Sequence, residues 1–394
     1  MLITAGRVLT EATSEYLTDG AVLVQGDAIV AVGPRTELEE LAPEGTPRLD
    51  FPESTLLPGL IDCHVHLVFD GSADPTAALQ QAQDEALFAD MEVRAEQLLG
   101  TGVTTARDLG DRNGLAIRLG AAIAEGAAHG PRIVSAGTPV TPQGGHCWFL
   151  GGEVDGEAEV RTIVQRNAAS GAAVIKAMVT GGGLTKGGAA SWENQFSTEE
   201  LAALVDEAHK AGLPVAAHAH GTDGIAAAVA AGVDSIEHCT WMTEDGFELR
   251  KEVLDEILAN GIHVCPAVSQ HWQMLPRIFG QERADAMFGL IREMADAGVK
   301  LVAGTDAGVQ RAGFGGLISS LGFYAHLGLP NSRIIDMATA EAARALGLGD
   351  QTGRLVPGYK ADLLIVDGDP LKDLGALSSV RTVITAGRHY QPKM

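Results

Sequence analysis

The sequence contains few of the residues that several common functions require. Only four cysteines occur among 394 residues, and no two of them form a CxxC pair, which argues against a zinc ribbon or a small disulfide framework. Basic residues are also scarce, since 28 lysines and arginines face 51 acidic residues, for a net charge of −23. A chain with this charge repels nucleic acids and anionic membrane surfaces, so we expect neither as a partner.

Long apolar runs are missing as well. Stretches such as residues 224–233 fall short of the ~20 residues that a membrane-spanning helix needs. The N-terminal segment lacks the cationic start and continuous apolar stretch of a signal peptide, so we expect a cytoplasmic protein. Three of the cysteines lie in apolar, strand-like runs and should be buried thiols. Cys147, beside His146 in a glycine-rich loop, is the candidate for an accessible thiol.

The two ends of the chain share a pattern of short strands and turns. Residues 1–57 alternate apolar and polar positions between Gly, Asp and Pro turn signals, and residues 352–394 repeat the pattern. We expect these segments to meet in one small β-sandwich domain. Residues 58–351 instead alternate eight short apolar runs with helical stretches, which predicts parallel βαβ units. Eight such units are typical of a (β/α)₈ barrel, which usually takes ~250 residues.

Two long glycine-rich segments interrupt this alternation. Residues 138–156 follow the third predicted strand and residues 180–197 follow the fourth. Barrel enzymes carry their chemistry on the loops at the carboxyl ends of the strands. We therefore expect these two segments to shape a pocket for a small-molecule substrate.

Potential metal ligands recur at the carboxyl ends of the predicted strands. His64 and His66 are two residues apart on the first strand, so both side chains can face the barrel interior. The barrel brings the ends of distant strands together, and imidazole and carboxylate groups suit zinc as well as manganese, cobalt or iron. The full set is His64, His66, Lys176, His218, His238 and Asp306.

Lys176 is the unusual member of this set. An ammonium group, with an ordinary pKa of ~10.4, repels metal cations instead of binding them. A surface lysine fits poorly in the apolar run AAVIKAMV, where an unpaired charge is costly. A Schiff-base lysine is a second interpretation, although the surrounding histidines give that chemistry no obvious use.

These motifs resemble the amidohydrolase superfamily over essentially the whole chain. The resemblance is carried by PGLIDCHVH, TTARDLG, VIKAMVTGG, VAAHAHG, SIEHCT, AGTDAG and GYKADLLIVDGDP. Within the superfamily, the sequence is similar to the imidazolonepropionase-related binuclear group, which includes Xaa-Pro dipeptidases and carboxypeptidases acting on Xaa-Arg and Xaa-Lys dipeptides. The resemblance implies two divalent metal ions, with Zn²⁺ as the expected ion.

The resemblance also implies a role for each ligand. Lys176 would be carboxylated by CO₂ and become an anionic bridge between the metals, with a water or hydroxide as the second bridge. Asp306 would be the general base that takes the proton of the attacking water. One metal would be held by His64, His66 and Asp306, and the other by His218 and His238.

Two further histidines match positions that contact the substrate in similar peptidases. His146 would face the substrate carbonyl. His220 would contact the substrate carboxylate or, equally, orient a metal ligand. On the second strand, Arg107 and Asp108 resemble an internal charge pair with a structural role.

The resemblance implies hydrolysis of an amide or peptide bond, with a dipeptide or an N-acyl amino acid as the expected substrate. Mononuclear deaminases carry a glutamate where this chain has Gly221, which favours the binuclear hydrolase. The alternative substrates are a non-peptide amide, urea, carbamate or lactone, which an aromatic pocket would favour over a cationic or multi-histidine one. A non-catalytic binding protein on this fold is disfavoured because all six ligands are present. We also expect a homo-oligomer, which is common among barrel enzymes.

Overall fold

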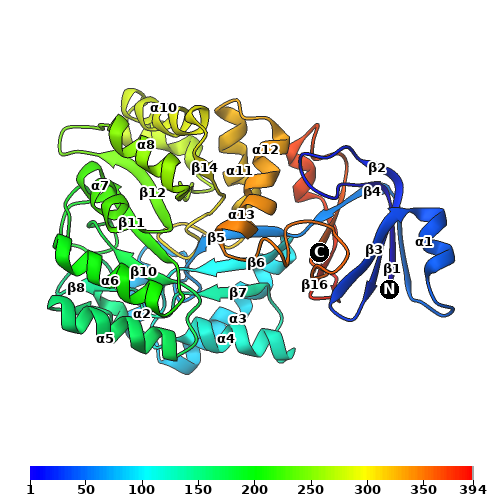
Figure 1. The fold of residues 1–394 in the computed structure, drawn as a ribbon, viewed down its shortest axis with the longest axis horizontal. Helices are drawn as coiled ribbons and strands as arrows, with labels where there is room; N and C mark the ends of the chain where they lie inside the picture. The colour runs from blue at the N-terminus through cyan, green and yellow to red at the C-terminus, as the bar shows by residue number, and fades with distance from the viewer. Residues whose placement is uncertain (393–394) are drawn as a thin grey trace.

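A computed structural model describes residues 1–392 of the chain. Parallel strands and helices make up most of the molecule, and a sheet built from both ends of the chain lies beside them, on the right of Figure 1. The N-terminus and the C-terminal strands both belong to this second part. Within residues 1–392, no helix combines the length and the apolar composition needed to cross a bilayer.

Both termini contribute to one seven-stranded sheet with the strand order β17-β16-β15-β4-β1-β2-β3. Strand β4 joins the two ends, because it pairs in parallel with β1 and antiparallel with β15. All seven strands belong to this single sheet, so the second layer of the expected sandwich stays a prediction. The strands are β1 (Leu2–Val8), β2 (Leu17–Gln25), β3 (Ala28–Pro34), β4 (Arg48–Pro58), β15 (Leu363–Asp367), β16 (Val380–Thr385) and β17 (Arg388–Tyr390).

Each of the eight apolar runs contains a parallel strand. The strands form a three-stranded sheet, β5-β6-β7, and a five-stranded sheet, β10-β11-β12-β13-β14. Isolated parallel bridges link the two sheets at both junctions, Val65 to Ala307 and Val140 to Ala177. The strands are β5 (Leu60–Val65), β6 (Val103–Asp108), β7 (Arg132–Ser135), β10 (Ile175–Met178), β11 (Val215–Gly221), β12 (Ser235–Met242), β13 (His263–Cys265) and β14 (Lys300–Leu301).

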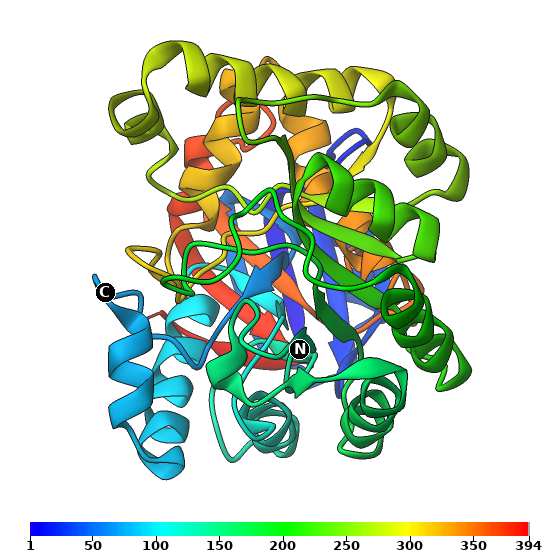
Figure 2. The ribbon, with the colours of Figure 1, turned by 90° about the vertical axis from the view of Figure 1, so that its left-hand side faces the viewer.

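Helices surround the parallel strands, and Figure 2 shows the strands at the centre of this arrangement. The result resembles a TIM barrel. The helices are α1 (Arg35–Leu41), α2 (Pro75–Gln81), α3 (Asp84–Gly100), α4 (Leu115–Glu125), α5 (Gly156–Ala169), α6 (Thr198–Lys210), α7 (Thr222–Ala231), α8 (Lys251–Asn260), α9 (Leu275–Phe279), α10 (Gln281–Ala297), α11 (Leu317–His326), α12 (Asn331–Met337) and α13 (Ala340–Ala345). Short elements within loops are β8 (Thr141–Pro142), β9 (Glu153–Val154), η1 (Trp148–Leu150), η2 (Trp272–Met274) and η3 (Leu374–Ser378).

Helix α6 shows how the sequence specifies these elements. Ser197 and Glu200 form a capping box that satisfies the free N–H groups at the start of the helix. Its apolar positions recur with helical spacing, so that one face is buried: Leu201, Leu204, Val205 and Ala208. Each fully buried leucine or valine side chain on this face contributes roughly 1.5–3 kcal/mol to the stability of the fold.

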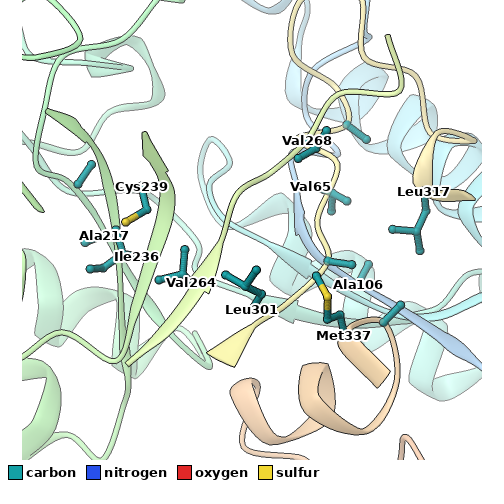
Figure 3. Packing of buried hydrophobic residues seen from close by; sticks show 14 of the residues in the cluster. Val65, Ala106, Ala217, Ile236, Cys239, Val264, Val268, Leu301, Leu317 and Met337 are labelled. Atoms are coloured by element: carbon teal, nitrogen blue, oxygen red, sulfur yellow. The ribbon is translucent and has the colours of Figure 1, made fainter. Parts of the chain in front are cut away.

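The largest hydrophobic core lies among the parallel strands and their helices. In Figure 3, Ile236 of β12, Val264 of β13 and Leu301 of β14 come from neighbouring strands and are fully or almost fully buried. This packing fixes the relative positions of the strand ends. Side chains at those ends are therefore attached to a rigid framework.

Candidate metal centre

The predicted site residues surround a single cavity of about 220 Å³ at the carboxyl ends of the parallel strands. His64 lies on β5, and His66 is the first residue after this strand. Asp306 lies in the loop after β14. Lys176, His218 and His238 lie on β10, β11 and β12, and His146 and His220 also line the cavity.

His64, His66 and Asp306 form a first ligand group. The Nε2 atoms of His64 and His66 are 3.3 Å apart and lie 3.4 and 3.5 Å from Oδ1 of Asp306. The Nδ1 atom of His64 faces a carboxylate oxygen of Glu237, and that of His66 faces the carbonyl oxygen of Gly110. Because both partners can only accept, both Nδ1 atoms carry the proton. Three acceptor atoms therefore converge on one point, an arrangement that a cation stabilises.

A second group of imidazoles consists of the predicted ligands His218 and His238 together with His220, and their ring nitrogens lie within 4.8 Å of one another. The Nε2 atom of His218 donates to the carbonyl oxygen of Gly181 at 3.1 Å, which leaves Nδ1 as its free acceptor. The rings of His64 and His238 lie 5.1 Å apart, so the two groups adjoin each other. The chemistry of these donors fits a pair of divalent metals.

Lys176 is 1% exposed, so the surface interpretation of this residue is wrong. Among the described residues, neither its Nζ atom nor Oδ1 of Asp306 has a hydrogen-bond partner. Burial lowers the pKa of Lys176 to about 8, because desolvation penalises the ammonium form. A buried amine and a buried carboxylate oxygen in one cavity, neither with a hydrogen bond to the described residues, fit a site that a further group completes.

Strained backbone places two of the ligands. His238 and Asp306 have φ values of 70° and 56°, in the left-handed region that side chains other than glycine rarely adopt. Such conformations cost roughly 1–3 kcal/mol each and persist where surrounding contacts enforce them. At His238, this turn breaks the regular strand alternation, so that two successive residues, Glu237 and His238, both contribute to the site.

Buried polar residues behind the ligands were not predicted from the sequence as parts of the site. Glu237 contacts the ring of His64, and Asp62 accepts hydrogen bonds from the backbone N–H groups of His64 and Thr305. Arg107 pairs with Glu237 at 2.8 Å. The acidic residue inside the apolar run SIEHCTW was a signal of this network.

The predicted pairing of Arg107 with Asp108 is wrong. Asp108 accepts hydrogen bonds from the backbone N–H groups of Leu67 and Gly110 instead. Successive strand residues point to opposite faces, so neighbours in a strand rarely pair with each other. The guanidinium of Arg107 reaches across to β12, whose register the sequence alone does not specify.

The expectation of an accessible Cys147 is also wrong. All four cysteines are buried, and burial raises the pKa of the Cys147 thiol to about 12. Residues 180–197 cover this loop, and the backbone N–H of Cys147 donates to Oγ1 of Thr185. Cys147 therefore lines the cavity as a protonated thiol.

The profile of the Amidohydrolase family matches residues 55–389, which include every residue of the cavity. The chain belongs to the amidohydrolase family. A second profile, of the bacterial imidazolonepropionase-like composite domain, matches residues 20–44 of this amidohydrolase. Members of the family are metal-dependent hydrolases that act on carbon–nitrogen bonds.

Individual relatives resemble the amidohydrolase over nearly its full length. An ochratoxinase from Aspergillus niger is 29% identical over 425 residues, covering 97% of this chain and 84% of the relative. An imidazolonepropionase from Paracoccus denitrificans is 28% identical over 383 residues, covering 89% and 88%. The crystal structure of a Xaa-Pro dipeptidase with methionine bound in its active site is 30% identical, covers 99% of both chains and superimposes with a TM-score of 0.86.

The structure gives a physical reason for Gly221 in this amidohydrolase. A Cβ atom at this position would lie 2.3 Å from the carbonyl oxygen of Trp192, in the loop of residues 180–197. A larger residue would therefore displace that loop. A glutamate, which the resemblance implies at this position in mononuclear deaminases, would meet the same obstacle.

Two side chains of the neighbouring loops, Lys186 and Trp272, lie outside the cavity. Lys186 is exposed and pairs with Asp74 at 3.0 Å. Trp272 is buried against Phe288 and Phe323, so its role is packing. Among the described residues that line the cavity, Lys176 is the only lysine or arginine.

Acid should destabilise the metal-free amidohydrolase. Burial lowers the pKa of His66 and His220 to about 4 and that of His146 to about 3. In the unfolded chain these imidazoles titrate at ~6.5, so between pH ~6.5 and ~4 each of them makes stability fall as the pH falls. Burial raises the pKa of Asp62, Asp108, Asp111 and Asp306, which opposes this trend, but the six cavity histidines, all with lowered pKa values, outnumber them. Urea unfolding in the presence of a chelator should show a falling midpoint across this window. A midpoint that rises as the pH falls from 7 to 5 would contradict burial of neutral histidines.

Proposed function

We propose that this amidohydrolase hydrolyses an amide or peptide bond at a binuclear metal centre on a closed (β/α)₈ barrel. The observation that carries the proposal is the convergence of unsatisfied atoms on one cavity. Two imidazole nitrogens and Oδ1 of Asp306 meet within 3.5 Å, and the Nζ atom of Lys176, which lines the same cavity, has no hydrogen-bond partner within residues 1–392. The bridges between the two parallel sheets support the closed barrel.

The metals, which we expect to be Zn²⁺, would activate a water and polarise the scissile carbonyl when bound. His64, His66 and Asp306 would hold one ion, and His218 and His238 the other. Lys176 would lie between them as a carbamate, formed when its neutral amine attacks CO₂ and releases a proton. Its lowered pKa, about 8, supports this because only the neutral amine reacts.

Asp306 is the proposed general base. Its carboxylate lies in the cavity, 3.4 and 3.5 Å from the Nε2 atoms of His64 and His66. In the metal-free site, burial raises its pKa to about 7, because desolvation penalises the ionised form. It would accept a proton from the attacking water and donate it to the leaving nitrogen. The family profile and the positions of the ligands support placing the reaction in residues 58–351, with residues 1–57 and 352–394 as a structural domain.

The proposed substrate is a dipeptide or an N-acyl amino acid. The recess contains His146 and His220 beyond the ligands, and the similar solved structure is a Xaa-Pro dipeptidase. A second candidate is a non-peptide amide, urea, carbamate or lactone. The apolar side chains of Met178, Leu184 and Val309 in the cavity wall favour this candidate, as does the similarity to an ochratoxinase.

A substrate panel distinguishes these candidates. Metal-loaded enzyme should hydrolyse members of a set of Xaa-Pro, Xaa-Arg and Xaa-Lys dipeptides, N-acyl amino acids and aryl amides, and chelator-treated enzyme should hydrolyse none. Turnover of dipeptides supports the first candidate, and turnover of aryl amides alone supports the second. A fully metal-loaded enzyme that cleaved no amide, urea, carbamate or lactone would refute the proposal.

His146 is the proposed contact of the substrate carbonyl. Its ring lies 4.7 Å from that of His218, and a Cβ atom on Gly182 would contact it at 2.5 Å, so the ring has little room to move. His146→Ala should lower kcat by roughly 10²-fold, the effect of losing one oxyanion donor, while metal content stays unchanged. Trp148→Ala, in the same loop but 42% exposed, is the matched control. An effect of similar size in both variants would indicate a loop defect.

A further inference from the structure

A buried chain of charged side chains lies behind His64. Its Nδ1 atom is 2.9 Å from Oε2 of Glu237, whose Oε1 is 2.8 Å from Nη2 of Arg107. Arg107 also donates to the carbonyl oxygen of Cys63 and to Oγ of Ser235, and Ser235 donates to Oε1 of Glu237. None of these side chains is more than 3% exposed. The network is therefore rigid and shielded from water.

The chain determines which nitrogen of His64 carries its proton. A carboxylate only accepts hydrogen bonds, so Nδ1 of His64 must donate and Nε2 keeps its lone pair. That lone pair faces His66 and Asp306. The Nδ1 atom of His66 and the Nε2 atom of His218 have backbone carbonyls as partners, whereas the Nδ1 atom of His64 has a carboxylate.

A different arrangement of the same residues is a metal site made of His64, Glu237 and Cys265, whose ligand atoms lie within 4.8 Å of one another. The hydrogen bonds argue against it. Both oxygens of Glu237 are already engaged, one by His64 and the other by Arg107 and Ser235. Burial also raises the pKa of Cys265 and keeps it a thiol.

We propose that Glu237, held in place by Arg107, is a positioning residue that fixes the tautomer of His64 and thereby sets the affinity of one metal position. The proposal rests on the metal centre of the proposed function but not on the substrate. Removing a carboxylate that accepts a hydrogen bond from a ligating imidazole typically lowers metal affinity by roughly 10- to 100-fold. The metal affinity of the position formed by His64 and His66 should depend on Glu237. The metal affinity of the position formed by His218 and His238 should not.

Glu237→Gln gives the first test. Arg107 has only donors, so it will hold the amide oxygen and turn the NH₂ group toward His64. His64 must then accept at Nδ1 and carry its proton on Nε2, which removes the lone pair from the cavity. We expect one metal to bind roughly 10- to 100-fold more weakly in chelator competition. ¹⁵N NMR of the histidine side chains should show the change of tautomer.

Two charge-free double variants give the second test, in case the single variant folds poorly. Arg107→Met with Glu237→Gln frees the amide to rotate, so its oxygen can accept from His64 again. Arg107→Met with Glu237→Met leaves His64 without an acceptor. The first pair should bind the metal roughly 10- to 100-fold more tightly than the second. Equal affinities in the two pairs would overturn the proposal.

Glu341→Gln is the matched control. Glu341 forms a second network of the same kind, 2.9 Å from Nε2 of His263 and 2.5 Å from Nη2 of Arg344, outside the cavity. Its loss should leave both metal affinities unchanged. If metal binding depends on Glu237 but no substrate is hydrolysed, the proposed function is overturned and this inference is supported. If the Glu237→Gln enzyme is active and binds metal with unchanged affinity, this inference is overturned and the proposed function is supported.

Discussion

Replacing Lys176 with alanine should abolish most of the activity, with a loss on the order of 10³-fold or more in kcat. In the proposed centre, the carbamate of Lys176 would be the anion between two cations, and its loss would leave the cations to repel each other. The structure offers no substitute, because no other lysine or arginine among the described residues lines the cavity. Steady-state kinetics and elemental analysis of the same preparation test the expectation, and less than two equivalents of metal should remain.

The control for this variant is Lys186→Ala, which removes an exposed lysine from the neighbouring loop. It should keep its activity and its metal. A short carboxylic acid added to Lys176→Ala should restore part of the activity, because it can occupy the space of the lost carbamate. Full occupancy of both metals in Lys176→Ala, together with undiminished turnover, would refute the bridging role.

Asp306→Asn should lower kcat by roughly 10²- to 10⁴-fold, the usual contribution of a general base, with a much smaller effect on KM. The amide has nearly the same shape as the carboxylate but cannot accept and release the proton. Kinetics at saturating metal separate this effect from weakened metal binding. Asp296→Asn, on the exposed face of α10, is the control. A change confined to KM would contradict the role of Asp306 in proton transfer.

The sequence was sufficient to predict the parallel strands and to select eight polar residues that the structure places around the cavity: His64, His66, His146, Lys176, His218, His220, His238 and Asp306. Each apolar run is short and bounded by turn signals, and the spacing of His64 and His66 follows the strand period. Polar groups at the ends of strands stand out because the rest of each strand is apolar. These signals are local in the sequence, so they can be recognised without knowing the register between the strands.

Features that depend on long-range pairing were beyond the reach of the sequence. Glu237 and Arg107 are 130 residues apart, and only the register of the strands brings them together. Strand alternation also predicts that Glu237 and His238 face opposite sides, whereas the left-handed turn at His238 brings both to the site. Likewise, the single terminal sheet follows from β4 pairing with both β1 and β15, strands that come from opposite ends of the chain.

The most direct test of the central claim is the number of metal ions bound per chain. Protein purified without chelator and supplied with Zn²⁺ and bicarbonate should contain two equivalents by elemental analysis, and removal of both should abolish hydrolysis. The account predicts that both ions are needed for activity. One equivalent or none in a fully active enzyme would contradict the binuclear centre.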